Sequence, residues 1–124
     1  ELRVGNLIQE GKIEQIDKSI DEVYYSGDGY YQSNYCCNLN PILITEDWLL
    51  KFGFNTTFEK ITEIQINENE VLYYDISEKC MSLYVPVHYE DTSLVFNHCK
   101  YIHQLQNLYF ALVNSELQLL EAGI

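Results

Sequence analysis

Tyrosine is the residue type that stands out for its chemistry in this chain of 124 residues. There are 11 Tyr against 5 Phe and 1 Trp, and a group lies within and beside one polar stretch: Tyr24, Tyr25, Tyr30, Tyr31 and Tyr35. A phenol ring offers a flat apolar face that stacks on a nucleobase, and a hydroxyl that hydrogen-bonds. We therefore predict that this group binds a ligand. Two alternatives stay open, because tyrosines also anchor protein partners and also cover half-buried sheet faces.

A second group of polar side chains recurs at helical spacing further along the chain. His103, Gln104 and Asn107 stand opposite an apolar stripe, and Gln106 lies on its flank. Imidazole and amide groups can read the edge of a base or ribose hydroxyls without adding charge. We predict His103, Gln104 and Asn107 as ligand-binding residues. The alternatives are a solvent-facing side of the helix, or side chains that satisfy the backbone groups of a sheet edge.

The charge balance limits the classes of partner. With 7 basic and 19 acidic residues, the chain has a formal net charge of −12, which repels phosphate backbones, so we expect no direct nucleic-acid binding. A local cation can still attract an anion, because salt screens the distant negative charges. Arg3 and Lys100 are the cations that we expect to meet a phosphate. The acidic residues are dispersed, which favours a solubilising surface over imitation of DNA.

Sequence signatures of catalysis are absent. The chain has no GxSxG elbow, Walker A sequence, GxGxxG, HExxH or EF-hand loop. Cys36, Cys37, Cys80 and Cys99 lack the CxxC spacing typical of zinc sites. We therefore expect no enzyme, no cofactor and no metal, and we expect Cys80 and Cys99 to be small buried residues.

These candidate residues require strands and two helices to position them. Alternating apolar residues predict short, bent, barrel-like antiparallel strands in a β-rich part over 2–37, with a turn-rich loop from Ser26 to Asn40. A short helix is expected over 45–53, with Thr45 as its cap and Gly53 as its stop. A meander of three or four strands over 58–96 and a C-terminal helix over 100–121 complete the pattern. The fold class is α+β with an antiparallel β-meander, in a single domain over 1–124.

The apolar segments are too short for a membrane protein. No stretch approaches the roughly 18 uninterrupted apolar residues that span a bilayer, and the first residues, ELRVGNLI, lack the basic-then-apolar order of a signal peptide. We expect a cytoplasmic protein without membrane association. A homo-oligomer is compatible with this composition.

Three segments resemble a known group of proteins. LRVGNLI at 2–8, LITEDWLLKFGF at 43–54 and YIHQLQNLYFAL at 101–112 resemble small uncharacterised proteins of bacteriophages and prophage regions. The resemblance implies a phage-encoded accessory protein in the cytoplasm of the infected bacterial host. Small phage proteins of this kind often counter host defence. The Tyr-rich, Cys-containing middle and the tail NSELQLLEAGI depart from the family pattern.

The residues and the resemblance together predict an immune-evasion function. We expect a sponge that binds and sequesters a small nucleotide immune signal, either cyclic ADP-ribose-like or a cyclic oligonucleotide, without turnover. The alternative is a protein-interaction module that inhibits a host protein, with an acidic and DNA-mimicking surface, or another phage accessory role.

Overall fold

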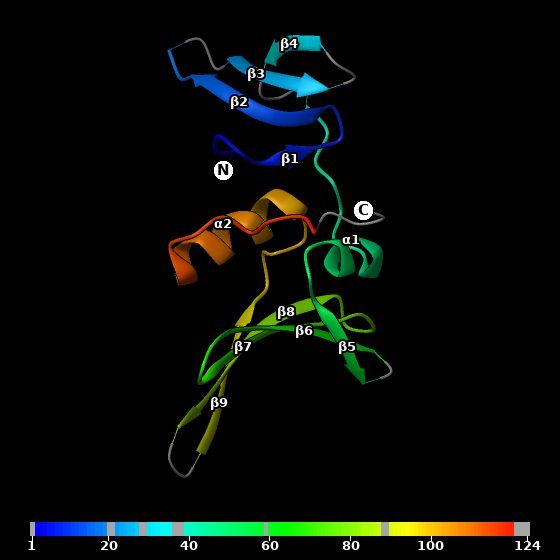
Figure 1. Cartoon of the computed structure of the whole chain (residues 1–124), viewed down its shortest axis with the longest axis vertical. Helices are drawn as coiled ribbons and strands as arrows, with labels where there is room; N and C mark the ends of the chain where they lie inside the picture. The colour runs from blue at the N-terminus through cyan, green and yellow to red at the C-terminus, as the bar shows by residue number, and fades with distance from the viewer. Residues whose placement is uncertain are drawn as a thin grey trace.

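The computed structural model of the chain describes residues 2–19, 22–27, 30–35, 39–58, 60–87 and 90–120. It has two antiparallel sheets, of four and five strands, and two helices, one of which lies between the sheets (Figure 1). The predicted α+β class with antiparallel meanders is confirmed.

The N-terminal sheet has the strand order β1-β2-β3-β4. Its strands are β1 (Leu7–Ile8), β2 (Gly11–Asp17), β3 (Glu22–Gly27) and β4 (Tyr30–Tyr35). The predicted short bent strands are confirmed as far as β3. The sheet is open rather than barrel-like, because β1 and β4 lie at its opposite edges.

The predicted turn-rich loop over residues 26–40 is wrong for its central part. Residues 30–35 form β4, which pairs with β3 from Gly27 opposite Tyr30 to Glu22 opposite Tyr35. The sequence between the strands is Asp28-Gly29, a strong two-residue hairpin signal. Tyrosine also favours strands, since its ring packs well on a pleated surface.

The C-terminal sheet runs β5-β6-β7-β8-β9 in sequence order. Its strands are β5 (Asn55–Phe58), β6 (Ile61–Asn67), β7 (Glu70–Asp75), β8 (Cys80–Val87) and β9 (Glu90–Phe96). The predicted meander is therefore present but has five strands. The run expected as one strand from Phe58 to Ile66 is divided into β5 and β6, which form a hairpin.

The two helices begin where the sequence predicts. Helix α1 (Glu46–Lys51) is capped by Thr45, whose hydroxyl accepts from the Trp48 amide at 3.3 Å, and Gly53 follows with a φ of +93°. Helix α2 (Ile102–Val113) is shorter than the expected range 100–121. Asn114 ends it in the left-handed region with a φ of 59°, a conformation that asparagine tolerates well.

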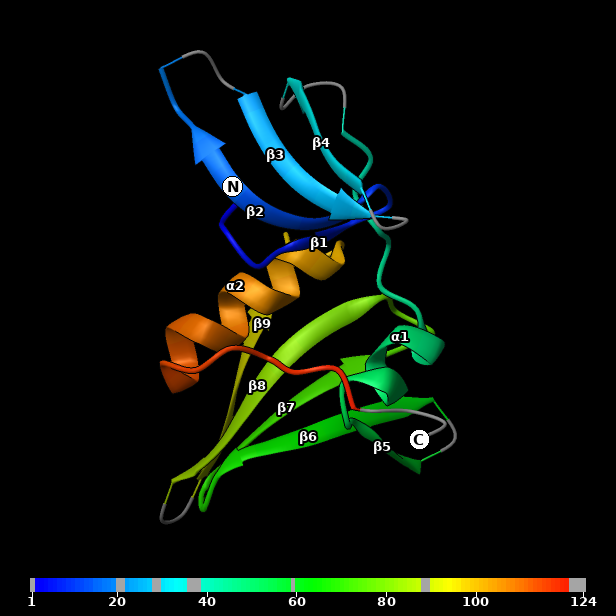
Figure 2. The ribbon, with the colours of Figure 1, turned by 45° about the horizontal axis from the view of Figure 1, so that its top comes forward.

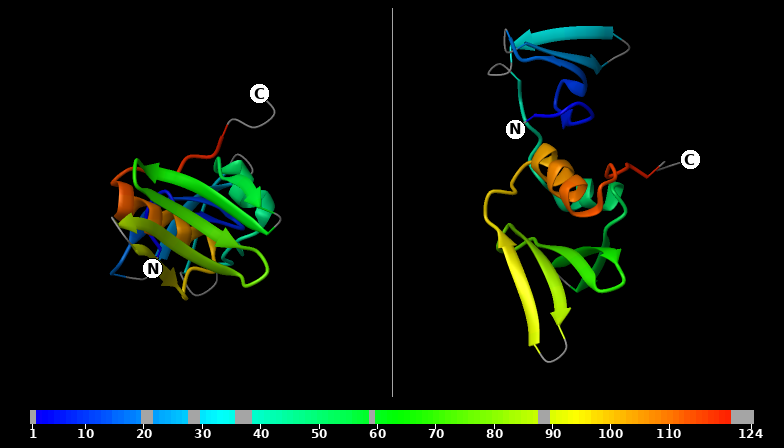
Figure 3. Two further views of the ribbon diagram at one scale, coloured as in Figure 1. Left: turned by 90° about the horizontal axis from the view of Figure 1, so that it is seen from below. Right: turned by 90° about the vertical axis from the view of Figure 1, so that its left-hand side faces the viewer.

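The chain has two separate apolar cores. The main core lies between the C-terminal sheet, both helices and Leu117 of the C-terminal segment. The smaller core lies on the N-terminal sheet and comprises Ile8, Ile13, Val23 and Tyr25. Helix α2 separates the two sheets, with β1 lying against it (Figures 2 and 3). Neither helix in the described part of the chain is long and apolar enough to cross a membrane.

Candidate functional site: a pocket between two lysines

A pocket of about 530 Å³ lies between the segment before α1 and the turn that joins β7 to β8. We call it the lysine pocket, and its lining residues are Leu43, Ile44, Thr45, Glu46, Tyr74, Ile76, Glu78, Lys79 and Lys100. A neighbouring pocket of about 460 Å³ shares Glu78, Lys79 and Lys100. Two of the chain's seven basic residues therefore stand together between two hollows.

Lys79 is held in place by an ordered turn. The Asp75 carboxylate accepts from the Ser77 amide at 2.9 Å, the Ser77 hydroxyl at 2.6 Å and the Glu78 amide at 3.2 Å. These bonds, the Ser77 hydroxyl first, lower the pKa of Asp75. Lys79 itself has a φ of 53°, a left-handed conformation that costs energy for a side chain other than Gly or Asn. A left-handed residue at the end of a short hairpin loop lets the chain enter the next strand.

Lys100 is positioned by the start of α2. The Gln104 side-chain oxygen accepts from the amides of Lys100 at 2.8 Å and Tyr101 at 3.0 Å. The Lys100 carbonyl in turn accepts from the Ile44 amide at 3.0 Å. Predicted ligand residues Lys100 and Gln104 thus belong to one arrangement, in which Lys100 lines the pocket and Gln104 fixes its backbone.

Tyr74 brings a polar group to the pocket from the inner face of β7. Its side chain is only 5% exposed and belongs to the main core. Burial raises the pKa of Tyr74, so the hydroxyl stays protonated and can donate. A phenol hydroxyl that lines a pocket can donate to a ligand oxygen.

The lysine pocket can hold an amphipathic anion. The one ion pair in the described part of the chain joins Arg3 to Glu116. The ammonium groups of Lys79 and Lys100 therefore form no ion pair with a described carboxylate. Leu43, Ile44 and Ile76 supply apolar wall. Glu46 and Glu78 add acceptors, so the lining balances two positive charges with two negative ones. The pocket therefore fits a molecule that carries an anion, an apolar face and hydrogen-bond donors.

The structure places Tyr24 and Tyr25, two of the five predicted tyrosines, on opposite faces of the N-terminal sheet. They are neighbours in β3, and successive side chains of a strand point to opposite faces. Tyr25 is buried in the smaller core, and its hydroxyl donates to Gln32 at 3.3 Å. The backbone of β4 includes Tyr30, Tyr31 and Tyr35, whose side chains lie outside the described part of the structure. Residues 36–38, which include Cys36 and Cys37, also lie outside it.

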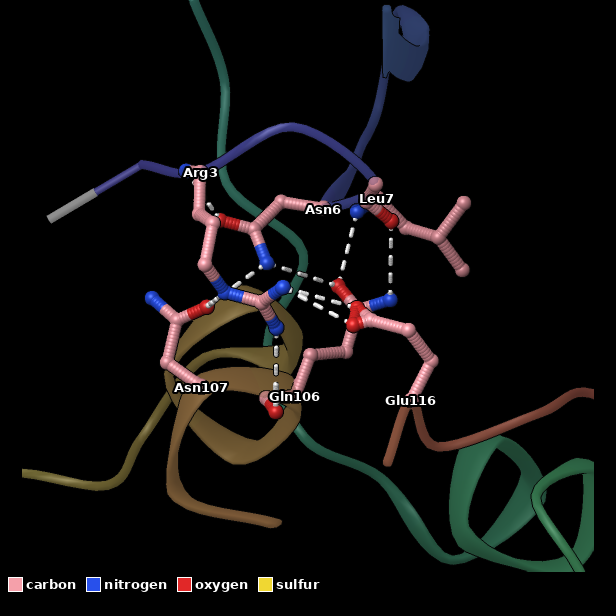
Figure 4. A network of polar contacts seen from close by, with 7 residues as sticks. Arg3, Asn6, Leu7, Gln106, Asn107 and Glu116 are labelled. Atoms are coloured by element: carbon pink, nitrogen blue, oxygen red, sulfur yellow. Dashed lines mark hydrogen bonds and ion pairs between the residues drawn. The ribbon is translucent and has the colours of Figure 1, made fainter. Parts of the chain in front are cut away.

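Arg3 and Asn107 meet in a polar network that joins the N-terminal segment to α2 (Figure 4). Arg3 Nε donates to Asn107 Oδ1 at 2.9 Å, and Arg3 Nη1 donates to both carboxylate oxygens of Glu116 at 2.8 Å. The guanidinium also lies 4.6 Å from the ring centre of Phe110. Arg3 is one of the two cations that we expected to meet a phosphate, and its guanidinium is bound to partners within the chain.

Gln106 binds backbone groups at a sheet edge, which is one of the alternatives that the sequence left open for the polar face of this helix. Its side-chain oxygen accepts from the Leu7 amide at 2.8 Å, and its nitrogen donates to the Gly5 carbonyl at 3.2 Å (Figure 4). The amide thus pairs with the edge of β1 as another strand would. The prediction that polar side chains of this helix satisfy backbone groups of a sheet edge is confirmed for Gln106.

His103 and Cys99 are buried beside these contacts. His103 is 9% exposed, its ring stacks on Tyr101 with centroids 5.8 Å apart, and its Nδ1 has no hydrogen-bond partner among the described residues. Burial lowers the pKa of His103 and raises that of Cys99 to about 12. Cys99 is fully inside the main core, as expected, whereas Cys80 is half-buried. No group of three described His, Cys, Asp or Glu residues could hold a metal ion.

The sequence did not reveal Lys79 and Tyr74 as site residues. Lys79 lies in a Ser-Glu-Lys turn that signals only a reversal of the chain. Tyr74 is one tyrosine in an alternating strand, which predicts sheet packing. Their proximity to Lys100 depends on how β7, β8 and α2 pack, and spacing along the sequence carries no signal for it.

No family model, curated protein or solved structure matches the chain. The resemblance to phage proteins therefore stays a prediction.

Proposed function

We propose that the chain binds a small nucleotide-like anion in the lysine pocket and holds it without turnover. One observation carries this proposal. The Lys79 and Lys100 ammonium groups, neither of which has an ion-pair partner among the described side chains, line the same hollow as Tyr74 in a chain with a net charge of −12.

The lining suits the three parts of a nucleotide. The two ammonium groups can pair with phosphate oxygens, and Leu43 and Ile76 can lie against the face of a base. Glu46 and Glu78 can accept from ribose hydroxyls or an exocyclic amino group. A volume of about 530 Å³ is within the usual range for small-molecule sites, roughly 300–1,000 Å³. Cyclic ADP-ribose-like molecules and cyclic oligonucleotides carry all three parts.

The biological role that fits this binding is sequestration of a nucleotide immune signal. It combines the pocket with the resemblance to phage proteins and with the lack of catalytic motifs. On this proposal the protein acts as a sponge in the cytoplasm of an infected bacterium.

Isothermal titration against cyclic ADP-ribose and a panel of cyclic dinucleotides tests the proposal. We expect binding by the natural chain and a loss of roughly tenfold or more for each lysine changed to Gln, because charge-assisted hydrogen bonds contribute about 1.5–3 kcal/mol. The matched control is Lys12→Gln with Lys18→Gln, which removes the same charge from two exposed positions of the N-terminal part. Equal losses in this control and in the variant that carries both Lys79→Gln and Lys100→Gln would show attraction by overall charge and not a site.

Tyr74→Phe separates binding from folding. The change removes only the hydroxyl and keeps the ring in the main core, so the free energy of unfolding should change little, while affinity should fall. Chromatography of the bound nucleotide should return it unchanged. If no nucleotide of the panel binds more tightly than millimolar, or if all are hydrolysed, the proposal is wrong.

A further inference from the structure

The lysine pocket and the neighbouring pocket meet at three shared side chains. Glu78, Lys79 and Lys100 line both of them, and every other described lining residue belongs to only one of the two. Their volumes are similar, about 530 and about 460 Å³. Because both ammonium groups stand at the shared wall, an anion bound there has a hollow on each side.

Strand β7 divides the two pockets. Successive side chains of a strand point to opposite faces of a sheet, and Tyr73 and Tyr74 are neighbours in β7. Tyr74 lines the lysine pocket from the inner face, whereas Tyr73 lines the neighbouring pocket from the outer face. Lys79 lies in the turn between β7 and β8, where the two faces meet. A ligand held at this turn can therefore reach both pockets.

A short side chain forms the floor of the neighbouring pocket. Ser82 pairs across the sheet with Tyr73 on one side and with Val95 on the other, and it is 4% exposed. Because a serine is much shorter than a tyrosine, it leaves a depression beside the phenol ring of Tyr73. A planar base can pack against a ring of this kind.

We propose, resting on the proposed function, that the nucleotide is a cyclic dinucleotide, with one base in each pocket and its two phosphates on Lys79 and Lys100. A cyclic dinucleotide has two bases and two phosphates, carried by a ring of alternating riboses and phosphates. Two pockets that share two ammonium groups match this composition. A cyclic ADP-ribose-like molecule has a single base and leaves one pocket empty.

The carboxylates lie where such a ligand presents hydrogen-bond donors. Glu46 lines only the lysine pocket of the two, and Asp75 lines only the neighbouring pocket, so each can accept from the exocyclic amino group of one base. The three hydrogen bonds that hold Asp75 all end on Oδ1, and Oδ2 can accept from the ligand. Glu78 lies at the shared wall, where it can accept from a ribose hydroxyl.

Two tryptophan substitutions fill one pocket each without changing the net charge. Leu43 is 61% exposed and lines the lysine pocket, whereas Asn97 is exposed and lines the neighbouring pocket. In isothermal titration with cyclic di-AMP and cyclic di-GMP, we expect one ligand per chain. Leu43→Trp and Asn97→Trp should each weaken binding roughly tenfold or more, because each excludes one base.

His98→Trp is the matched control for these variants. His98 is exposed, follows Asn97 in the chain and lines neither of the two pockets, so this variant should bind as the natural chain does. Circular dichroism checks that all three variants keep their strand content.

Probes with a single base complete the test. AMP carries one base and one phosphate, so it should bind roughly tenfold or more weakly than the better cyclic dinucleotide. Unchanged affinity of Asn97→Trp for both cyclic dinucleotides overturns the proposal. So does binding of AMP or cyclic ADP-ribose that is as tight as that of the better cyclic dinucleotide. In these cases the proposed function stands, because a nucleotide still binds. If no nucleotide binds, the proposed function fails as well.

Discussion

Among single residues, His103 makes the stability of the fold depend on pH. Burial lowers its pKa from the ordinary value of 6.5, because removal from water disfavours the charged imidazolium. In the unfolded chain the same imidazole takes up a proton near its ordinary pKa. Between the two pKa values the unfolded state binds more protons than the folded state, so the free energy of unfolding falls as the pH drops below about 6.5.

Urea denaturation between pH 7.5 and pH 5 checks this dependence. His103→Gln should flatten the fall in the free energy of unfolding over that range, because the variant cannot take up the proton when it unfolds. The comparison variant is His98→Gln, the same change at an exposed histidine. A natural chain that gains stability toward pH 5 would contradict the assignment to His103.

The residues of the lysine pocket show how far single-residue reasoning reaches. Lys100 was predicted because cations are scarce in this chain, and it does line the pocket. Arg3 was predicted for the same reason, yet its guanidinium is occupied by Glu116 and Asn107. The small number of cations points to Arg3 as a candidate, but it does not reveal what Arg3 binds. Its partners lie more than a hundred residues away in the sequence.

At the scale of elements, β2 and β3 cross closely where two glycines face each other. A Cβ atom added to Gly27 would lie 2.2 Å from the Glu10 carbonyl oxygen, and one added to Gly11 would lie 2.0 Å from the Ser26 carbonyl oxygen. Both obstacles are backbone atoms, which cannot rotate away as a side chain would. The two glycines therefore let the start of β2 pass the end of β3.

Gly27→Ala should separate these strand ends and destabilise the N-terminal sheet by about 1–3 kcal/mol, the usual cost of overpacking. Urea denaturation gives the change in the free energy of unfolding. Ser26→Ala, one residue away, is the comparison, because the Ser26 hydroxyl bonds only to the exposed Glu14 carboxylate at 2.9 Å and its loss should matter little. Equal stability of Gly27→Ala and the natural chain would refute the close approach.

The elements that local sequence determines were predicted, and those set by distant contacts were not. Thr45 and Gly53 begin and end α1 through bonds within a few residues, so their types are sufficient. The sequence placed the end of α2 too late. After Asn114 the chain leaves the helix, because Leu117 is buried in the main core and the Leu120 amide donates to the Lys51 carbonyl at 2.7 Å. Strand β4 had a local signal in Asp28-Gly29, which polar neighbours obscured.

For the whole molecule, the joint between the two sheets is polar. Among the side chains that the structure describes, the smaller core has four buried apolar residues, with Leu2, Ile16 and Leu39 packed against them, and it is much smaller than the main core. The N-terminal sheet attaches to α2 through Gln106, Asn107 and Arg3, whose partners lie on residues 5–7 and on Glu116. We infer that the N-terminal sheet opens before the main core.

Gln106→Ala tests this order of opening by hydrogen exchange. The change leaves the Leu7 amide and the Gly5 carbonyl without a partner, at about 1–3 kcal/mol for each buried group. Amides of β1 to β3 should then exchange roughly tenfold faster or more, while those of β6 to β8 keep their protection, because the main core retains its apolar contacts. Gln118→Ala, at an exposed glutamine of the C-terminal segment, should leave both sheets unchanged. A uniform increase across both sheets would mean that they unfold as one unit, and an unchanged N-terminal sheet would mean that Gln106 does not hold the joint.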